Sequence, residues 1–512
     1  MSDGDHRSKK ADILSTTQSV LEVGGRLASS PSDALVASAF QAEVEAGSAL
    51  FHGVSLADLA HTVMLTRSGV IPKAASRELL SALLELHDQS DSFLPEPKNG
   101  DIYTNREAWL AGKTESVGWL GAARARREAM TTGLHIGLRS AIIDLIEEVA
   151  GACDVIVDLS SAHHETLMPD YTYLQIAQPT TFGHYLLGFG FPLMRDMERL
   201  GAVLDNINKS PAGCGSANGS IIDQDRAWLS DVLGFDEPME HGRDAMWQAD
   251  MPVQLAGALT SLLINLDRLA EDLFVFSTQE FGLVELSDAH ARASKIMPQK
   301  KNPFALSYVR SAANRMIGLQ TEMSAIGRTP SGQMDNRLSA YSQLPMMLEN
   351  CKKTVTLMAE VLRDLKFDAA QAAQSLAENA AFASDLAEYI MLESSLDFRS
   401  AHKTVGYALR KIIDDARSLD TLSIEDLERA AMETHVKKLE LDPLILAKAR
   451  NPKEAVNRRT CLGGAAPDQV LTGTKILNER VNAYLEIIGE KKRSIERAEA
   501  DLIKLSRKLA KG

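Results

Sequence analysis

The sequence predicts an all-α fold, and two observations lead to that prediction. From about residue 107 to 370, long segments carry apolar side chains every three or four positions and are interrupted by few helix breakers. The alternation of apolar and polar residues that marks half-buried strands is scarce along the whole chain. Helices of this length bury their apolar stripes best against one another, so the middle of the chain is expected to form a long helical bundle.

The helical segments fall into three groups, which predict helical domains at 1–106, 107–371 and 372–512. The first group begins at about residue 32, after a polar stretch, and ends at LPEPKNGDIYTN, whose prolines and Asn-Gly pair mark a turn-rich break. The second group holds the longest segments, at 131–160, 181–208, 252–278, 304–327 and 342–366.

The third group consists of shorter segments. A helix-start signal, in which Ser423 precedes Asp426 by three positions, and a glycine break at Gly463-Gly464 divide it. The tail from about 481 to 510 is heavily charged with spaced leucines and isoleucines, and we interpret it as a surface or subunit-contact helix.

Composition and charge exclude several classes of protein. The 512 residues are 45% apolar and 24% charged, as in ordinary globular proteins. A net charge of -14 argues against nucleic-acid binding, so an anionic ligand must be held by local positive groups. The four cysteines lack zinc-site spacing, and neither a metal nor a cofactor is expected. Without a signal peptide or a long uncharged apolar run, the protein is expected to be cytoplasmic and free of membrane.

One segment, SKIMPQKKNPF, which starts at Ser294, cannot be regular helix. Pro298 and Pro303 each remove a backbone donor and restrict the residue before them, which predicts a loop that leads into a helix. Backbone amides at a helix start bind anions, and Ser294, Lys300 and Asn302 would add a hydroxyl, a cation and an amide. On residue chemistry alone, a solvated lysine pair ahead of a helix is the more economical interpretation.

The same segment resembles the signature loop of the aspartase/fumarase superfamily, and its QKKNP form is most similar to the argininosuccinate lyase branch. MPDYTYLQIAQPTTFGHYLLG, at 168–188, is similar to that branch's segment around a threonine-histidine pair, and DIYTN, at 101–105, resembles its DIHT motif. EFGLVELSDA, AGCGSANGS and LGGAAP add further likeness. The resemblance covers about 101 to 475. It implies a homotetramer whose central helices form a twenty-helix bundle, with each active site built from three subunits.

The resemblance also implies a chemistry. Family members remove a proton from the carbon beside a carboxylate and expel an amine or hydroxyl, usually releasing fumarate, so fixed donors must stabilise the developing charge. It makes Ser294 the base and places Lys300 and Asn302 beside Thr172 as those donors. Serine works as a base only if loop amides and Lys300 hold its alkoxide form, and closure of the loop would exclude water. The other substrate contacts that it implies are Thr104, Arg126, Arg127, Gln178 and Gln333.

Departures from the family pattern bear on the substrate. Where the branch has histidine after threonine, this chain has Tyr173, and the glutamate that pairs with that histidine corresponds to Ser307. Both partners change together, which favours replacement by uncharged hydrogen-bonding groups, with Tyr173 as a candidate acid or leaving-group contact. Ala293 and Lys295 flank Ser294, so its loop is bulkier and more basic than usual.

The serine-arginine-asparagine run that binds carboxylates in the family corresponds here to Ala125, Arg126 and Arg127. One arginine is retained and a second is added, which favours bidentate carboxylate binding. The alternative interpretation of this basic run is a helix face held in salt bridges.

The positions that hold the arginine part of argininosuccinate in the family appear here as Gln333, Leu338 and Tyr341. The contacts to a guanidinium are therefore not reproduced. Trp247 and Gln248 stand where the branch has smaller or charged residues, and they either reshape the pocket or, for Trp247, belong to the core.

Together these observations predict a carbon-nitrogen lyase that cleaves an N-substituted aspartate into fumarate and an amine by an E1cB-like path. An argininosuccinate lyase in the strict sense is a narrower version of this prediction. The replaced histidine-glutamate pair and the altered contacts to the arginine part of the substrate argue against it. Two alternatives stay open. One is a divergent lyase or cyclase acting on a different amino-acid-derived dicarboxylate in a specialised pathway. The other is a non-catalytic structural homologue, against which the retention of Ser294, Lys300 and Asn302 at their usual intervals argues.

Overall fold

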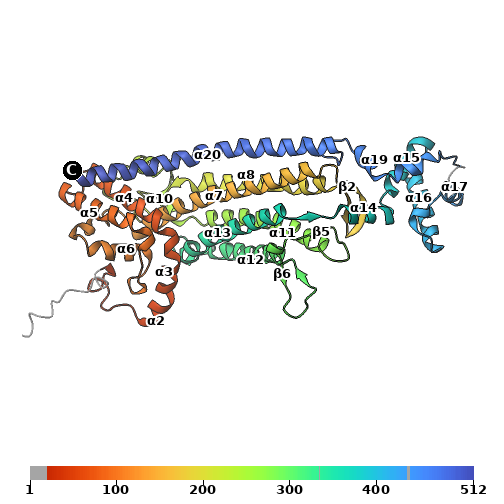
Figure 1. Cartoon of the computed structure of the whole chain (residues 1–512). Coiled ribbons are helices and arrows are strands. Elements are labelled where there is room, and N and C mark those ends of the chain that lie inside the picture. Colours follow the sequence, from red (N-terminus) through yellow and green to blue (C-terminus); the bar gives the residue numbers. More distant parts are fainter. Residues whose placement is uncertain (1–19, 334, 435–438) are drawn as a thin grey trace, which may run out of the picture.

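The computed structural model describes residues 20–333, 335–434 and 439–512, and within them the prediction of an all-α fold is confirmed (Figure 1). Long helices run side by side through the middle, shorter helices gather at both ends, and the strands form short pairs. Each long helix coincides with a segment that the apolar period predicts. These helices are α7 (Arg126–Ala162), α8 (Phe182–Ile207), α11 (Asp250–Phe276), α12 (Phe304–Ile326) and α13 (Asp335–Arg363).

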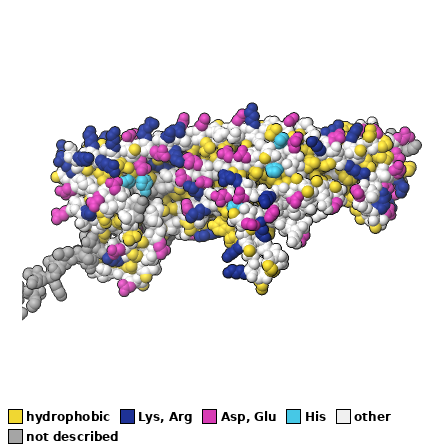
Figure 2. All heavy atoms as spheres, in the orientation of Figure 1, with side chains coloured by type: hydrophobic (Ala, Val, Ile, Leu, Met, Phe, Trp, Pro, Cys, Tyr) yellow, Lys and Arg dark blue, Asp and Glu magenta, His cyan; other side chains and the backbone are white. Residues whose placement is uncertain are grey.

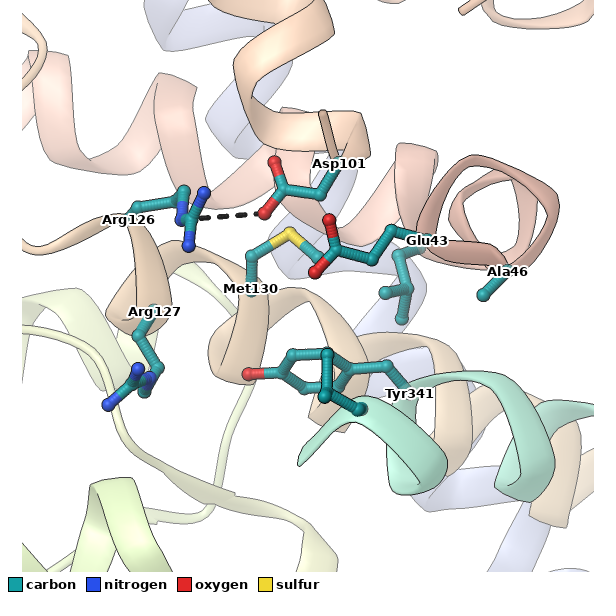
Figure 3. Close-up of a pocket in the computed structure, with 9 residues that line it drawn as sticks. Glu43, Ala46, Asp101, Arg126, Arg127, Met130 and Tyr341 are labelled. Atoms are coloured by element: carbon teal, nitrogen blue, oxygen red, sulfur yellow. Dashed lines mark ion pairs between the residues drawn. The ribbon is translucent and has the colours of Figure 1, made fainter. Parts of the chain in front are cut away.

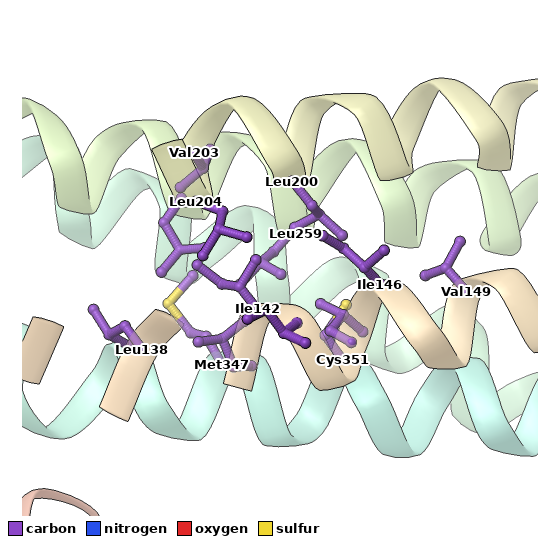
Figure 4. Close-up of a cluster of buried hydrophobic side chains, with 14 of the residues drawn as sticks. Leu138, Ile142, Ile146, Val149, Leu200, Val203, Leu204, Leu259, Met347 and Cys351 are labelled. Atoms are coloured by element: carbon purple, nitrogen blue, oxygen red, sulfur yellow. The ribbon is translucent and has the colours of Figure 1, made fainter. Parts of the chain in front are cut away.

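The central core lies where α7, α8, α11 and α13 face one another (Figure 4). Ile142 and Ile146 of α7 are fully buried there, as are Leu204 of α8, Leu259 of α11 and Met347 of α13. Burying one such side chain stabilises the fold by about 1.5–3 kcal/mol. Because the buried positions recur every three or four residues along each helix, the core extends along the length of the bundle.

Shorter helices close one end of the bundle. Helix α4 is buried on nearly every side because it lies among α5, α7 and α20. The N-terminal helices therefore share the hydrophobic core of the bundle. The elements at this end are α2 (Asp33–Leu35), a π-helical turn (Val36–Phe40), α3 (Gln41–Gly47), a 3-10 turn (Ser48–Leu50), α4 (Phe51–Arg67), α5 (Lys73–Asp88) and α6 (Ile102–Ala111).

A second, smaller core lies at the opposite end, where Leu386, Ile390 and Ile412 are buried. The predicted start signal is confirmed, since Ser423 and Asp426 form a reciprocal capping box at the start of α17. The helices at this end are α14 (Ala369–Glu378), α15 (Ala383–Ser394), α16 (Phe398–Asp414), α17 (Ile424–Glu433), α18 (Leu444–Ala449) and α19 (Pro452–Asn457).

The last helix, α20 (Pro467–Lys511), returns along the length of the bundle to its N-terminal end (Figure 1). Its residues Val481, Ile488 and Leu502 are buried in the large core, and the helix as a whole packs against α5, α7 and α8. One face of the charged tail therefore belongs to the hydrophobic core, which the prediction of a surface or subunit-contact helix did not include. The domain boundaries at 106/107 and 371/372 stay predictions.

The strands serve mainly to place loops. The hairpin of β1 (Leu167–Thr172) and β2 (Gln175–Thr181) lies at the C-terminal end of α7, and the pair of β6 (Arg292–Ala293) and β7 (Lys301–Asn302) projects from the side of the bundle (Figure 1). In the described ranges, no helix is both long and apolar enough to cross a membrane. The remaining elements are β3 (Lys209–Ser210), α9 (Arg226–Val232), β4 (Glu237–Pro238), α10 (Gly242–Trp247), β5 (Val284–Glu285) and β8 (Lys366–Phe367).

Candidate active site

The segment that starts at Ser294 forms the tip of the projecting hairpin and leads into α12, as its prolines predict. Arg292 pairs with Asn302 across β6 and β7, and the Asn302 side chain donates a hydrogen bond to the Arg292 carbonyl at 2.8 Å. The Ser294 N–H donates to the carbonyl oxygen of Lys300 at 3.2 Å, which closes the loop. Asn302 is thus held at the base of the loop by its own amide.

The hydroxyl of Ser294 faces two backbone donors. Its Oγ atom accepts the N–H of Met297 at 3.0 Å and that of Ile296 at 3.4 Å. Donors directed at an oxygen favour its anionic form, because they bind the charge more strongly than the neutral hydroxyl. The loop amides that a serine base requires are therefore present within a single chain.

The two adjacent lysines of this loop differ. Lys301 makes ion pairs with Glu285 at 3.0 Å and Asp288 at 2.7 Å, which tie the hairpin to the bundle. Lys300 is exposed and makes no ion pair with any residue that the structure describes. Figure 2 shows basic and apolar side chains on the projecting hairpin, and Ile296 is 84% exposed there. A cation and an apolar surface are thus presented away from the bundle, while the predicted contact of Lys300 with Ser294 or a ligand stays a prediction.

Thr172 and Tyr173 lie at the tip of the other hairpin. Thr172 pairs with Gln175, so Tyr173 and Leu174 form a two-residue turn, and the Tyr173 side chain is 99% exposed. The predicted roles of these two side chains require contacts that lie outside this chain, because the turn points into solvent.

Gln178 lies further along β2, where it faces the C-terminal helices. Its side-chain amide donates a hydrogen bond to the Ser384 hydroxyl at 3.0 Å, at the start of α15. Between the pairs Tyr171–Ile176 and Pro169–Pro179, β2 has one residue more than β1, which is a β-bulge. The predicted substrate contact of Gln178 stays a prediction.

A third group of predicted residues lines a pocket among α3, α6, α7 and α13 (Figure 3). The cavity measures about 30 Å³ and is partly open to solvent. Arg126, at the first position of α7, makes an ion pair with Asp101 at 3.4 Å while remaining 47% exposed. Thr104 is buried, and its hydroxyl donates to the Asp101 carboxylate at 2.7 Å. Thr104 therefore orients the partner of Arg126, and its own substrate contact stays a prediction.

The acidic side of this pocket contains a carboxyl that the sequence analysis did not single out. Glu43 of α3 points toward Asp101 in Figure 3, and burial, followed by the charge of Asp101, raises the pKa of Glu43, while Arg126 opposes that rise. No local motif marks Glu43, because a glutamate on an amphipathic helix is ordinary. Asp101, in contrast, is recognisable as a helix-capping residue ahead of α6.

Arg127 faces a different wall from Arg126. Its guanidinium lies over the ring of Trp247, 4.2 Å from the ring centroid, and burial lowers its pKa. Trp247 packs against a small core that includes Met246, which favours its interpretation as a core residue, and its effect on the pocket stays a prediction. A Cβ at Gly332 would lie 4.0 Å from Trp247, which places the exposed Gln333 on the loop beside it. The predicted substrate contacts of Arg127 and Gln333 stay predictions.

Glu128, the next residue on α7, is a buried carboxyl that also carries no motif of its own. Its Oε1 atom accepts the N–H of Gly213 at 2.8 Å, from the glycine-rich loop 212–220, and burial raises the pKa of Glu128 to about 7. The glycine-rich loop is therefore fastened to the start of α7, next to Arg126 and Arg127.

The predicted site residues fall into three groups that one chain keeps apart (Figure 1). Helix α7 has 37 residues and so runs for about 55 Å between Arg126 and the hairpin that carries Thr172. Helix α12 has 23 residues and extends about 35 Å from the hairpin that carries Ser294 toward the loop with Gln333. One chain therefore does not bring the pocket of Arg126 together with the turn at Thr172 or with the loop at Ser294.

Two family models match this chain. The one described as Lyase matches residues 59–318, and the one described as Argininosuccinate lyase C-terminal matches residues 380–452. The chain is 30% identical to an argininosuccinate lyase of Methanothermobacter thermautotrophicus, over 84% of this chain and 92% of that protein. It is 32% identical to an argininosuccinate lyase of Thermus thermophilus, over 87% of this chain and 96% of that protein.

Solved structures share the fold. A variant of EDDS lyase with bound fumarate is similar with a TM-score of 0.84 at 24% identity, over 94% of this chain and 97% of that one. A class II fumarase of Schistosoma mansoni is similar with a TM-score of 0.68 at 13% identity, over 86% and 94%. At these identities the likeness concerns the fold alone, and function must be argued from the site.

Proposed function

The chain belongs to the lyase family, in the argininosuccinate lyase branch of the aspartase/fumarase superfamily, and on that premise we propose that it cleaves an N-substituted aspartate into fumarate and an amine. It is a carbon-nitrogen lyase of the kind that releases fumarate. The observation that carries the finer proposal is the pair of backbone amides directed at the Ser294 oxygen. They supply, without a cofactor, the stabilisation that a serine base needs.

In the proposed reaction, the Ser294 alkoxide takes a proton from the carbon beside one carboxylate of the aspartate unit. The electron pair left on that carbon is delocalised into the carboxylate, which Lys300, Asn302 and Thr172 hold. It then forms the double bond of fumarate as the C–N bond breaks. The amine leaves with a proton that the Tyr173 phenol donates, and solvent restores both hydroxyls to their starting forms.

The distance between the three groups supports a site shared between chains. Ser294, Thr172 and Arg126 would act together only if separate copies of the chain each contributed one group. The homotetramer that the family resemblance implies would provide this, and it stays a prediction. A mixture of Ser294→Ala and Tyr173→Phe chains, refolded together, is expected to be far more active than either variant alone, because some sites would then contain neither substitution.

The pocket of Arg126 bears on the leaving amine. Leu338 and Tyr341 line this pocket, and the Tyr341 hydroxyl is within 3.1 Å of the Thr131 hydroxyl. A neutral phenol and an apolar side chain do not form the charged contacts that the polar end of argininosuccinate needs. We therefore infer that the substrate is an aspartate adduct other than argininosuccinate, although argininosuccinate belongs in any panel that tests this.

Ultraviolet monitoring of fumarate tests the proposal. Purified protein is offered argininosuccinate and a series of N-substituted aspartates, and at least one is expected to release fumarate. Ser294→Ala should lower kcat by about 10²–10⁴-fold. Ser324→Ala is the matched control, because this exposed serine lies at the far end of α12 and bonds only to its own helix. Fumarate release by Ser294→Ala at the wild-type rate would refute the assignment of the base. Turnover of another dicarboxylate without fumarate would favour the divergent lyase or cyclase.

A further inference from the structure

Two consecutive residues at the tip of the β1–β2 hairpin adopt left-handed backbone conformations. Tyr173 and Leu174 both have φ of 56°. Left-handed non-glycine residues also occur singly in the described chain, but no other two of them are adjacent. The turn links Thr172 to Gln175, the arrangement in which a type I′ turn places positive φ at both central residues.

Such a turn strains both residues. The left-handed conformation brings the Cβ of an L-residue too close to its own carbonyl oxygen, and for this reason turns of this type normally contain asparagine followed by glycine. Neither tyrosine nor leucine can form the local hydrogen bonds that let asparagine tolerate the conformation. The chain therefore carries two unfavourable residues where a favourable pair is available.

The stem of the hairpin holds this turn in place. Tyr171 packs between Phe276 and Phe281 of the bundle, with ring centroids 5.5 Å and 5.3 Å away. The strand that precedes the turn is thus anchored in the aromatic core. The tip has no such anchor, since Tyr173 is 99% and Leu174 57% exposed.

Contacts with the described part of the chain offset little of the strain, because the Tyr173 side chain is almost fully exposed and that of Leu174 is more than half exposed. Strained backbone that the fold does not need for packing is typical of functional positions, where conformation serves a contact made elsewhere. The Tyr173 phenol already has a proposed role as proton donor. Leu174 has none, although its conformation determines the direction of the turn that carries Tyr173.

We propose that Leu174 is a positioning residue that acts through Tyr173, and this rests on the proposed function. A glycine at 174 would relieve the strain, but it would also admit several turn types and several directions for the Tyr173 side chain. At the positive φ of this two-residue turn, a residue with a Cβ has only one narrow allowed region, whereas glycine has a wide one. Leu174 thereby holds the phenol in one direction before substrate binds.

The experiment compares two substitutions on the full-length protein with an aspartate adduct that the wild type cleaves. Leu174→Gly is expected to keep or raise the melting temperature and to lower kcat at least tenfold, with KM changed less than twofold. Leu174→Asn, which tolerates the left-handed conformation and retains a Cβ, is expected to keep kcat within about threefold of wild type. The matched control is Ala416→Gly, because Ala416 has φ of 51° and lies in the C-terminal helical group, where strain relief should leave kcat unchanged.

A double-mutant cycle shows whether Leu174 acts through Tyr173. In the Tyr173→Phe background, Leu174→Gly should lower kcat no further, because the group that it positions is gone. If Leu174→Gly keeps the wild-type kcat, this inference is wrong, and the proposed function still stands. An equal rise of KM in the glycine and asparagine variants would overturn it too, since Leu174 would then contact the substrate directly. A wild-type protein that releases fumarate from no adduct would overturn the proposed function, and this inference with it.

Discussion

The Oγ atom of Ser294 accepts the backbone N–H of Met297 at 3.0 Å, so the proposed base is held by the loop that carries it. The geometry requires the loop to fold back on itself, and the hydrogen bond from the Ser294 N–H to the Lys300 carbonyl closes that fold. A hydroxyl in this setting is prepared to become an alkoxide before any substrate arrives.

Removing the Met297 donor should weaken the base. Met297→Pro has no N–H to give to Ser294, and a hydrogen bond to a charged oxygen contributes about 1.5–3 kcal/mol, so kcat should fall roughly 10–100-fold. The rising limb of the pH-rate profile should also move to higher pH. Gln299→Pro, in the same loop, is the matched control for the rigidity of an added proline. Equal effects of both substitutions would mean that loop flexibility, and not the donor, matters.

Arg126 should bind a substrate carboxylate. Among the residues that the structure describes, its one ion pair is with Asp101 at 3.4 Å, and it is 47% exposed beside the pocket, so its guanidinium can engage a second anion. Arg126→Gln is expected to raise KM at least tenfold, and Arg126→Lys should recover only part of that loss because lysine lacks the planar fork. Arg507→Gln, which removes a surface pair with Asp88, is the control. Steady-state kinetics measures this, and an unchanged KM in Arg126→Gln would contradict the role of Arg126 in carboxylate binding.

Glu128 should make the protein less stable as the pH rises. Its folded pKa is raised by burial to about 7, above the value of 4.5 expected in the unfolded chain, so the unfolded state loses its proton first. The free energy of unfolding should therefore fall between about pH 4.5 and 7. Glu128→Gln cannot ionise and still accepts the Gly213 N–H. At pH 8 this variant should be more stable than the wild type, by up to about 3 kcal/mol.

Urea unfolding at pH 5, 6.5 and 8 measures this difference. Burial also raises the pKa of Glu107 to about 7, but that group is present in both proteins and cancels in the comparison. Glu479→Gln, on the exposed face of α20, is the control and should change stability little at any of the three pH values. A constant gap between wild type and Glu128→Gln across the series would refute the protonation argument.

The contact between α4 and α7 should not tolerate a side chain at Gly53, where the two backbones lie close together. A Cβ at Gly53 would lie 2.2 Å from the Gly133 carbonyl oxygen, and backbone cannot move aside as a flexible side chain can. Gly53→Ala is therefore expected to lower the free energy of unfolding by about 2 kcal/mol or more. Gly151→Ala, on α7 with no atom within 4 Å of the added Cβ, should raise it by up to about 1 kcal/mol. Thermal unfolding compares the two, and equal stability of Gly53→Ala and wild type would show that the helices can separate.

Local pattern was sufficient to predict the long helices and the loop that carries Ser294. The long helices follow from apolar periodicity, and the loop before α12 follows from Pro298 and Pro303. The need for loop amides at Ser294 follows from the weakness of serine as a base. These predictions hold because they depend on residues close in sequence, whose geometry the backbone restricts.

Other features depend on residues far apart in sequence and could not be predicted. Glu43 faces Asp101 only because α3 folds against the start of α6, and α20 enters the large core only because it turns back along the bundle. The left-handed turn at Tyr173 contradicts residue preference, which would have placed glycine there.

The amino-acid sequence was enough to predict that the chain is helical, where its long helices lie, and which hydroxyl, cations and amide are candidates for the proposed chemistry. Only the tertiary structure decided that these groups occupy three separate places, at one end of α7, at the other end, and on a hairpin at the side. The reason is that periodicity and turn chemistry act over a few residues, whereas helix length and packing direction set distances of tens of ångströms.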